Sequence, residues 1–213
     1  MCVPQTAKRA VAKLGCFNLA LKLNVTKTKE LVIDFRQKRE PILPLTIKNV
    51  PIDIVSLYIY LGITIDDKLN WHQHSFSLLK KLKQRLYFIR KLNSFHIDPT
   101  ILGLFYRAVF EGVLSFCVAC WGGNCRVKDK ILFESIIMRA GKLTRNSFNS
   151  FEIILNINLE RKVLSILKSE DHPIFKEIIF SERSGRVLYI RTKTERYKNS
   201  FLPLAVKLIP FKR

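Results

Sequence analysis

The spacing of apolar residues changes from a strand-like to a helical pattern at about Ser75, and this change restricts the chain to a mixed fold. Before that point, runs rich in β-branched and aromatic residues predict three strands: Leu31–Phe35, Leu45–Ile47 and Val55–Ile65. A polar turn, Asp66–Asn70, follows them. After it, apolar residues recur every three or four positions, as on one face of a helix: Leu78, Leu82, Leu86 and Ile89. The sequence therefore predicts an α+β fold.

Further helices have recognisable starts and ends. Asp98 is suited to accept from free backbone N–H groups and Pro99 fits the first helical position, so a second helix should begin here. It should run to about Trp121 as a central buried helix, because residues 101–121 are apolar on nearly every face. Glycines at 122 and 123 should close it. Two more helical patterns follow: Asp129–Leu143 and Phe151–Lys168.

The chain is strongly basic, with 37 Lys and Arg against 17 Asp and Glu in 213 residues, a formal net charge of +20. Such an excess favours a polyanionic partner such as RNA or DNA. It is densest in the first 29 residues and in Arg183–Arg213. Either segment is suited to contact a phosphate backbone, with an affinity that falls as salt rises. A solvated tail that binds nothing is the other interpretation, and it stays open.

Cysteine content and hydropathy bear on the compartment. Five cysteines are too few, and odd in number, for a disulfide framework, which indicates a reducing intracellular compartment, nuclear or cytoplasmic. The longest uncharged apolar stretch, Gly112–Cys125, is shorter than the ~20 residues that span a membrane. We therefore expect no membrane association.

Two groups of residues have the composition of catalytic metal sites. Asp66–Asp67 follows a strand, as magnesium-binding carboxylates do, but no third carboxylate accompanies the pair, and a turn is the better interpretation. His96, Asp98 and His172 match an iron(II) dioxygenase site, with Arg183 or Arg186 for a co-substrate carboxylate. Because His96 and Asp98 join two predicted helices, an N-cap role for Asp98 is preferred.

Cysteines and histidines suggest a third metal site. Cys117, Cys120 and Cys125 have thiolates for zinc, but no further Cys or His pair completes four ligands, so buried core cysteines are expected. His72 and His74 are expected at the entry of a helix rather than as a metal pair. We expect no cofactor.

Several segments, in order, resemble the reverse transcriptases of non-LTR (LINE-type) retrotransposons. Leu21–Arg36 resembles the segment after the catalytic Asp-Asp motif, and Lys80–Leu92 resembles a thumb helix. Tyr60, Leu61 and Gly62 resemble the primer grip, and a Leu69–Trp71 element follows them. The other similar segments are Asp98–Leu102, Phe105–Arg107, Cys120–Asn124, His172–Pro173, Ser184–Arg186 and Lys193–Pro203.

This resemblance covers residues 18–210 and implies a C-terminal fragment without the catalytic palm aspartates, hence without polymerase or other enzymatic activity. It implies five parts: an unassigned basic N-terminus (1–17), palm-edge and primer-grip-like strands (18–72), thumb-like helices (73–125), a helical C-terminal region (126–180) and a basic tail (181–213).

The implied residual function is non-specific binding of an RNA or DNA backbone. The residues expected to contact phosphate are Lys80, Lys81, Lys83, Arg85, Arg90 and Lys91 in the basic helix, and Arg186, Arg191, Lys193, Arg196 and Lys198 near the C-terminus.

A second, shorter resemblance leads to a different hypothesis. Leu79–Phe95 resembles the N-terminal region of the alkylated-DNA-repair AlkB homologue eight, over fewer than 20 residues. That resemblance implies the context of a 2-oxoglutarate- and iron-dependent dioxygenase or a tRNA methyltransferase, but the segment brings neither fold. The remaining alternative is a helical interaction module that associates through exposed apolar faces, such as Leu78–Leu82–Leu86.

Overall fold

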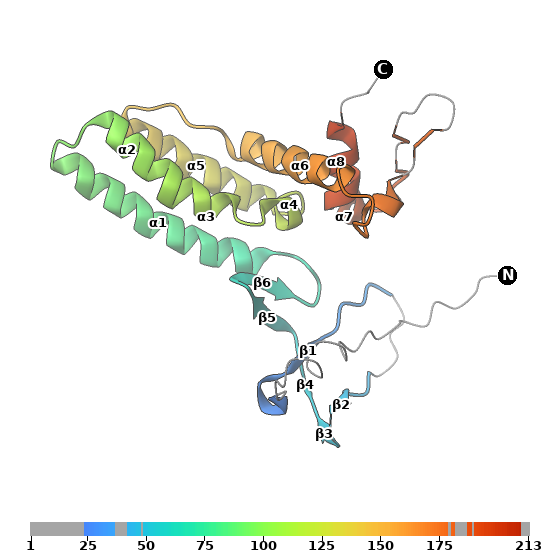
Figure 1. Cartoon of the computed structure of the whole chain (residues 1–213). Coiled ribbons are helices and arrows are strands. Elements are labelled where there is room, and N and C mark those ends of the chain that lie inside the picture. Colours follow the sequence, from blue (N-terminus) through green and yellow to red (C-terminus); the bar gives the residue numbers. More distant parts are fainter. Residues whose placement is uncertain are drawn as a thin grey trace. The chain divides into compact units, whose positions relative to one another are not determined.

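The computed structural model describes residues 24–36, 42–47, 49–178, 180–181, 187–188 and 190–209. The chain divides into two compact units, residues 1–57 and 58–213. Short strands precede a series of helices, which confirms the predicted α+β class (Figure 1). An origin of the strands in a reverse-transcriptase palm has no support in the structure.

The described part of the first unit contains two pairs of short strands. The predicted strand Leu31–Phe35 is wrong beyond Leu31. The Asp34 carboxylate accepts the backbone N–H of Arg36 at 2.9 Å, a local bond of the kind that competes with strand pairing. The elements of the unit are η1 (Val25–Lys27), β1 (Lys29–Leu31) paired in parallel with β4 (Asp53–Val55), and β2 (Thr46–Ile47) paired antiparallel with β3 (Val50–Pro51).

The predicted strand Val55–Ile65 is instead folded back on itself as a hairpin. Its strands are β5 (Leu57–Tyr60) and β6 (Ile63–Asp66). The two connecting residues both have positive φ, 48° at Leu61 and 85° at Gly62. Positive φ at both positions closes a two-residue hairpin, and glycine adopts it without steric cost.

A polar turn leads from the hairpin into the first long helix. The Asp66 carboxylate accepts the backbone N–H groups of Lys68, Asn70 and Trp71, each at 3.0 Å, which confirms the predicted turn. The helix α1 (His72–Ser94) begins directly after Trp71. All four residues of its predicted apolar stripe are buried: Leu78, Leu82, Leu86 and Ile89.

The second helix starts as predicted. Asp98 accepts the backbone N–H of Thr100 at 2.7 Å, and Pro99 occupies the first helical position. The helical path then passes through three segments: α2 (Pro99–Phe105), the π-helical η2 (Tyr106–Glu111) and α3 (Gly112–Ser115).

The predicted continuation to Trp121 is interrupted. Cys117 has a φ of 49°, and only the short α4 (Val118–Trp121) follows it. Trp121 is fully buried and donates its indole N–H to the carbonyl of Phe116 at 3.1 Å, so the break leaves this acceptor paired. Gly122 and Gly123 follow α4 as expected. A Cβ on Gly123 would clash with the backbone carbonyl oxygen of Asn199, so the close approach of these two backbone segments requires glycine at this position.

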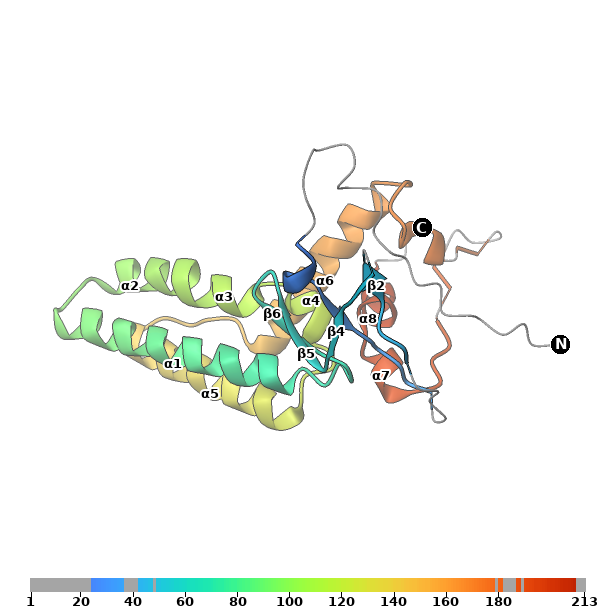
Figure 2. The same cartoon turned by 90° about the horizontal axis from the view of Figure 1, so that it is seen from below.

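The helices of the second unit pack around one main core. Figures 1 and 2 show α1, the α2–α3 run and α5 (Val127–Thr144) side by side. The helix α6 (Phe151–Leu167) packs against α4, α5 and α8 (Phe201–Leu208). Both helices predicted in this part are confirmed. The smaller elements are η3 (Phe175–Glu177) and α7 (Glu195–Lys198).

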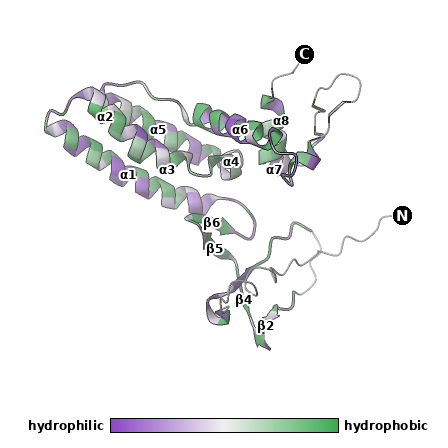
Figure 3. Cartoon of the chain, in the orientation of Figure 1, coloured by the Kyte–Doolittle hydropathy of each residue, from purple (hydrophilic) through white to green (hydrophobic). Residues whose placement is uncertain are grey.

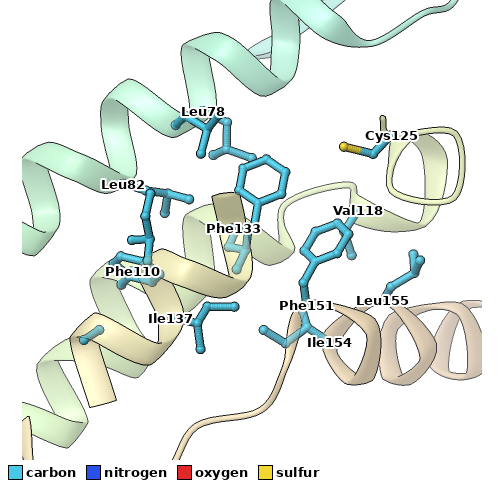
Figure 4. Packing of buried hydrophobic residues seen from close by; sticks show 14 of the residues in the cluster. Leu78, Leu82, Phe110, Val118, Cys125, Phe133, Ile137, Phe151, Ile154 and Leu155 are labelled. Carbon is cyan, nitrogen blue, oxygen red and sulfur yellow. The ribbon is translucent and has the colours of Figure 1, made fainter. Parts of the chain in front are cut away.

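The main core joins α1 to the helices opposite it. Figure 4 shows Leu78 and Leu82 of α1 on the side of Phe110 and Phe133, which are fully buried aromatic side chains of η2 and α5. Phe151 of α6 stacks on Phe133 with ring centroids 5.1 Å apart. Burial on one side fixes which side of α1 faces solvent. Within the described part of the chain, no helix combines the length and apolar character needed to cross a membrane.

Candidate nucleic-acid interface

The helix α1 has one buried side and one exposed side. Five of its six basic residues are exposed, and we call them the basic face of α1: Lys80, Lys81, Lys83, Arg90 and Lys91. The sequence of α1 contains no Asp or Glu that would offset this charge. Figure 3 shows hydrophilic residues recurring along the helix. The basic face is therefore exposed positive charge on a helix whose opposite side is fixed in the core.

Arg85, the sixth basic residue of α1, has a structural role. It is half-buried, and its Nε donates to the carbonyl of Val109 in η2 at 2.9 Å. Its Nη1 also donates to the carbonyl of Lys81 at 3.2 Å. The guanidinium thus joins α1 to η2, which differs from the phosphate contact predicted for it.

Exposed aromatic side chains accompany the lysines of α1, and the sequence analysis missed them. Phe76, Tyr87 and Phe88 are 51%, 54% and 53% exposed. The Lys80 Nζ lies 4.9 Å from the centroid of the Phe76 ring. The Tyr87 and Phe88 rings meet edge to face with centroids 6.0 Å apart. The sequence does contain a signal for this arrangement. Phe76, Lys80, Lys83 and Tyr87 are spaced three or four residues apart, which places them on one side of a helix.

The second set of predicted contacts is less uniform. Arg191 and Lys193 are exposed, as is Arg196 in α7. The Lys198 Nζ pairs with the Glu195 carboxylate at 3.0 Å, so part of its charge is offset. Arg186 lies outside the described residues.

Tyr60, Leu61 and Gly62 are exposed at the end of the β5–β6 hairpin. Their positions are explained by hairpin closure, since Leu61 and Gly62 supply the two positive φ angles of the connection. No observation on these residues indicates a nucleic-acid contact.

Three of the carboxylates and histidines considered for catalysis, Asp66, Asp98 and His172, have local structural roles. Asp66 accepts three backbone N–H groups of its turn. Asp98 caps α2, and its hydrogen bonds with Thr100 lower the pKa of its carboxyl. The His172 Nδ1 accepts the backbone N–H of Ile174 at 3.2 Å. His96, with a φ of 55°, is exposed in the loop after α1.

The predicted burial of the cysteines is wrong for two of three. Cys125 is buried, with its Sγ 3.4 Å from the Ser75 Oγ, but Cys117 and Cys120 are exposed because the helix breaks at Cys117. Burial raises the pKa of the Cys125 thiol. Across the described ranges, no three His, Cys, Asp or Glu side chains come together as metal ligands.

The two histidines at the start of α1 differ in environment. The His72 Nδ1 lies 3.7 Å from the Asp129 carboxylate, whereas His74 is buried with its ring 5.0 Å from that of Trp121. Burial and, less strongly, Lys81 lower the pKa of His74 to about 4. These positions confirm the helix entry predicted for the pair.

The apolar face suggested for self-association is not exposed. Leu78, Leu82 and Leu86 lie in the main core of the second unit. Exposed apolar side chains of this unit lie elsewhere, for example Ile131 and Met138 of α5 and Ile153 of α6.

Comparison with known proteins gives one family match. The family model described as "Alkylated DNA repair protein alkB homolog 8, N-terminal" matches residues 71–112. The match includes all of α1, α2 and η2, and covers about a fifth of the chain. No curated protein and no solved structure matches the chain.

This match corrects the family assignment made from the sequence. It is not to a reverse transcriptase, and none of the comparisons points to one, so the assignment to LINE-type reverse transcriptases is wrong. No palm, primer-grip or thumb role therefore applies to these segments. The alternative, a segment like the N-terminal region of AlkB homologue eight, fits better, and it is longer than the fewer than 20 residues expected. The conclusion is confined to this segment: residues 71–112 resemble that N-terminal family.

Proposed function

We propose that the second unit, residues 58–213, binds the phosphate backbone of RNA or DNA through the basic face of α1. The proposal concerns binding and not catalysis. The observation that supports it most directly is that α1 exposes five cations and contains no acidic residue, while its opposite side is packed in the core.

The charge of the unit supports the same interaction. Residues 58–213 contain 27 of the 37 basic residues and 13 of the 17 acidic ones, an excess of 14 positive charges. Exposed lysines that neutralise phosphates release condensed counterions, which favours binding at low salt and weakens it as salt rises. Binding of this kind does not depend on base sequence.

The family match is consistent with this interaction. The family is described as the N-terminal part of an alkylated DNA repair protein, and the matched segment contains every residue of the basic face. The match supports the choice of nucleic acid over other polyanions as the partner.

A salt-dependent titration tests the proposal. We expect labelled RNA to bind with a Kd of about 1–100 μM near physiological salt, as non-specific complexes do. Replacing Lys80, Lys83 and Lys91 together with Gln should weaken binding and lower the slope of log K against log[salt] by about 2–3. Lysine and glutamine have similar helix propensities, so α1 should persist.

The matched control removes the same charge elsewhere. Lys128, Arg139 and Lys142 are exposed on α5, and their joint replacement with Gln changes the net charge equally. If the α5 variant loses as much affinity as the α1 variant, or if the wild-type protein binds no RNA at low salt, the proposal is wrong.

A further inference from the structure

The basic face of α1 is interrupted by exposed aromatic rings at regular positions. Phe76 and Tyr87 lie about three helical turns apart, and Lys80 and Lys83 lie between them at the spacing of one side of a helix. Both rings are about half exposed, although aromatic side chains supply much of the apolar surface that proteins bury. Lysines and exposed rings therefore share one surface.

Rings and lysines recognise different parts of a nucleic acid. Ammonium groups contact phosphates, which single strands and duplexes both present. An aromatic ring stacks on the face of a base, and this contact tolerates every base because each has a π-face. In a duplex the base faces are covered by neighbouring base pairs, so only unpaired bases are available to Phe76 and Tyr87.

The environment of the rings suits them to this contact. The Lys80 ammonium lies over one face of the Phe76 ring, so a base that stacks on that face displaces the ammonium, which is then close enough to contact the adjoining phosphate. Phe88 meets Tyr87 at an interplanar angle of 64°, so the two rings contact through an edge rather than covering each other as a parallel stack. The charge around the rings favours a polyanion over an uncharged apolar peptide.

We propose that the preferred ligand of this surface is single-stranded RNA or DNA, with Phe76 and Tyr87 stacking on unpaired bases and the lysines contacting the adjoining phosphates. This inference rests on the proposed function, because it assumes that the basic face binds the backbone. It adds the class of nucleic acid and two further contact residues.

Paired titrations of a labelled, unstructured oligonucleotide and the same strand annealed to its complement test the inference. Replacing Phe76 and Tyr87 together with Leu keeps apolar side chains but removes both rings. We expect the double variant to bind the single strand about tenfold more weakly, or worse, with duplex affinity within about twofold of wild type. Phe116→Leu, which alters a ring 48% exposed outside α1, should change neither affinity.

A conservative variant provides a second readout. Tyr87→Trp keeps an aromatic ring, so it should retain single-strand affinity, and its indole fluorescence should be quenched by the single strand but not by the duplex. Circular dichroism of each variant checks that the helices are intact. Tyr87→Trp also keeps the inference testable if the double leucine variant does not fold.

The outcomes separate this inference from the proposed function. If the lysine variant weakens binding but the ring variants change single-strand affinity no more than duplex affinity, the inference is wrong and backbone binding stands. If the lysine variant changes neither affinity, the proposed function itself is wrong.

Discussion

At the scale of single residues, His74 shows how burial determines protonation in this protein. Its Nδ1 accepts the backbone N–H of Thr64 at 3.4 Å, which requires a neutral ring nitrogen, and its ring meets Trp121 edge to face. Burial, with a smaller contribution from Lys81, lowers the pKa of His74 to about 4 from an ordinary value of 6.5. His74 is thus neutral in the folded protein at neutral pH.

This pKa predicts a pH-dependent stability. Above pH 6.5 His74 is neutral in both folded and unfolded states. As the pH falls from 6.5 towards 4 the unfolded state takes up a proton that the folded state does not, so stability decreases through this window and His74 adds no further loss below it. Urea denaturation at a series of pH values measures the slope. His74→Asn, which keeps an acceptor near the Nδ1 position, should reduce it.

The control for this prediction is His96→Asn. His96 is exposed and has a φ of 55°, a conformation that asparagine tolerates. Its replacement should leave the pH slope as in the wild type. Equal slopes for wild type and His74→Asn would contradict the role assigned to His74.

At the scale of secondary-structure elements, Arg85 links α1 to η2 through its bond to the Val109 carbonyl. Replacing Arg85 with Lys keeps the charge but removes the planar guanidinium that reaches this carbonyl. We expect the free energy of unfolding to fall by about 1–3 kcal/mol, with the salt slope of RNA binding unchanged. Denaturation and titration of the same variant measure both quantities.

Lys83→Gln is the matched comparison, since Lys83 is exposed on the same helix. It should change stability by less than about 0.5 kcal/mol and lower the salt slope. A reversed pattern, in which Arg85→Lys lowers the salt slope and Lys83→Gln destabilises the protein, would show that the two roles are assigned wrongly.

Some elements could be predicted from the sequence and others could not. Periodic apolar residues were sufficient to predict α1, α5 and α6, because each of these helices buries one side in a shared core. The break at Cys117, where φ is 49°, is accompanied by the bond from the Trp121 indole to the Phe116 carbonyl, a contact that local apolar content does not reveal. The hairpin was missed because Leu61, an unusual residue at positive φ, occupies the turn with Gly62.

At the scale of the whole molecule, the sequence predicted the basic charge more completely than the packing of the helices. The excess of basic residues could be counted from the sequence, and the helical period placed Lys80, Lys83 and Lys91 on the outside of α1. The inward contact of Arg85 and the exposure of Phe76 and Tyr87 depend on how the bundle packs. A series of short sequence resemblances gave the wrong family, whereas the match over residues 71–112 includes the complete helix α1 and two of the segments that pack against it, α2 and η2.

NMR chemical-shift mapping measures directly where nucleic acid binds this protein. Adding an unstructured oligonucleotide to the full-length protein at low salt should shift the backbone amides of Phe76–Lys91 most strongly, and these shifts should reverse as salt is added. Shifts confined to the C-terminal basic residues 191–198, with α1 unchanged, would contradict the assignment of the basic face of α1 as the binding surface.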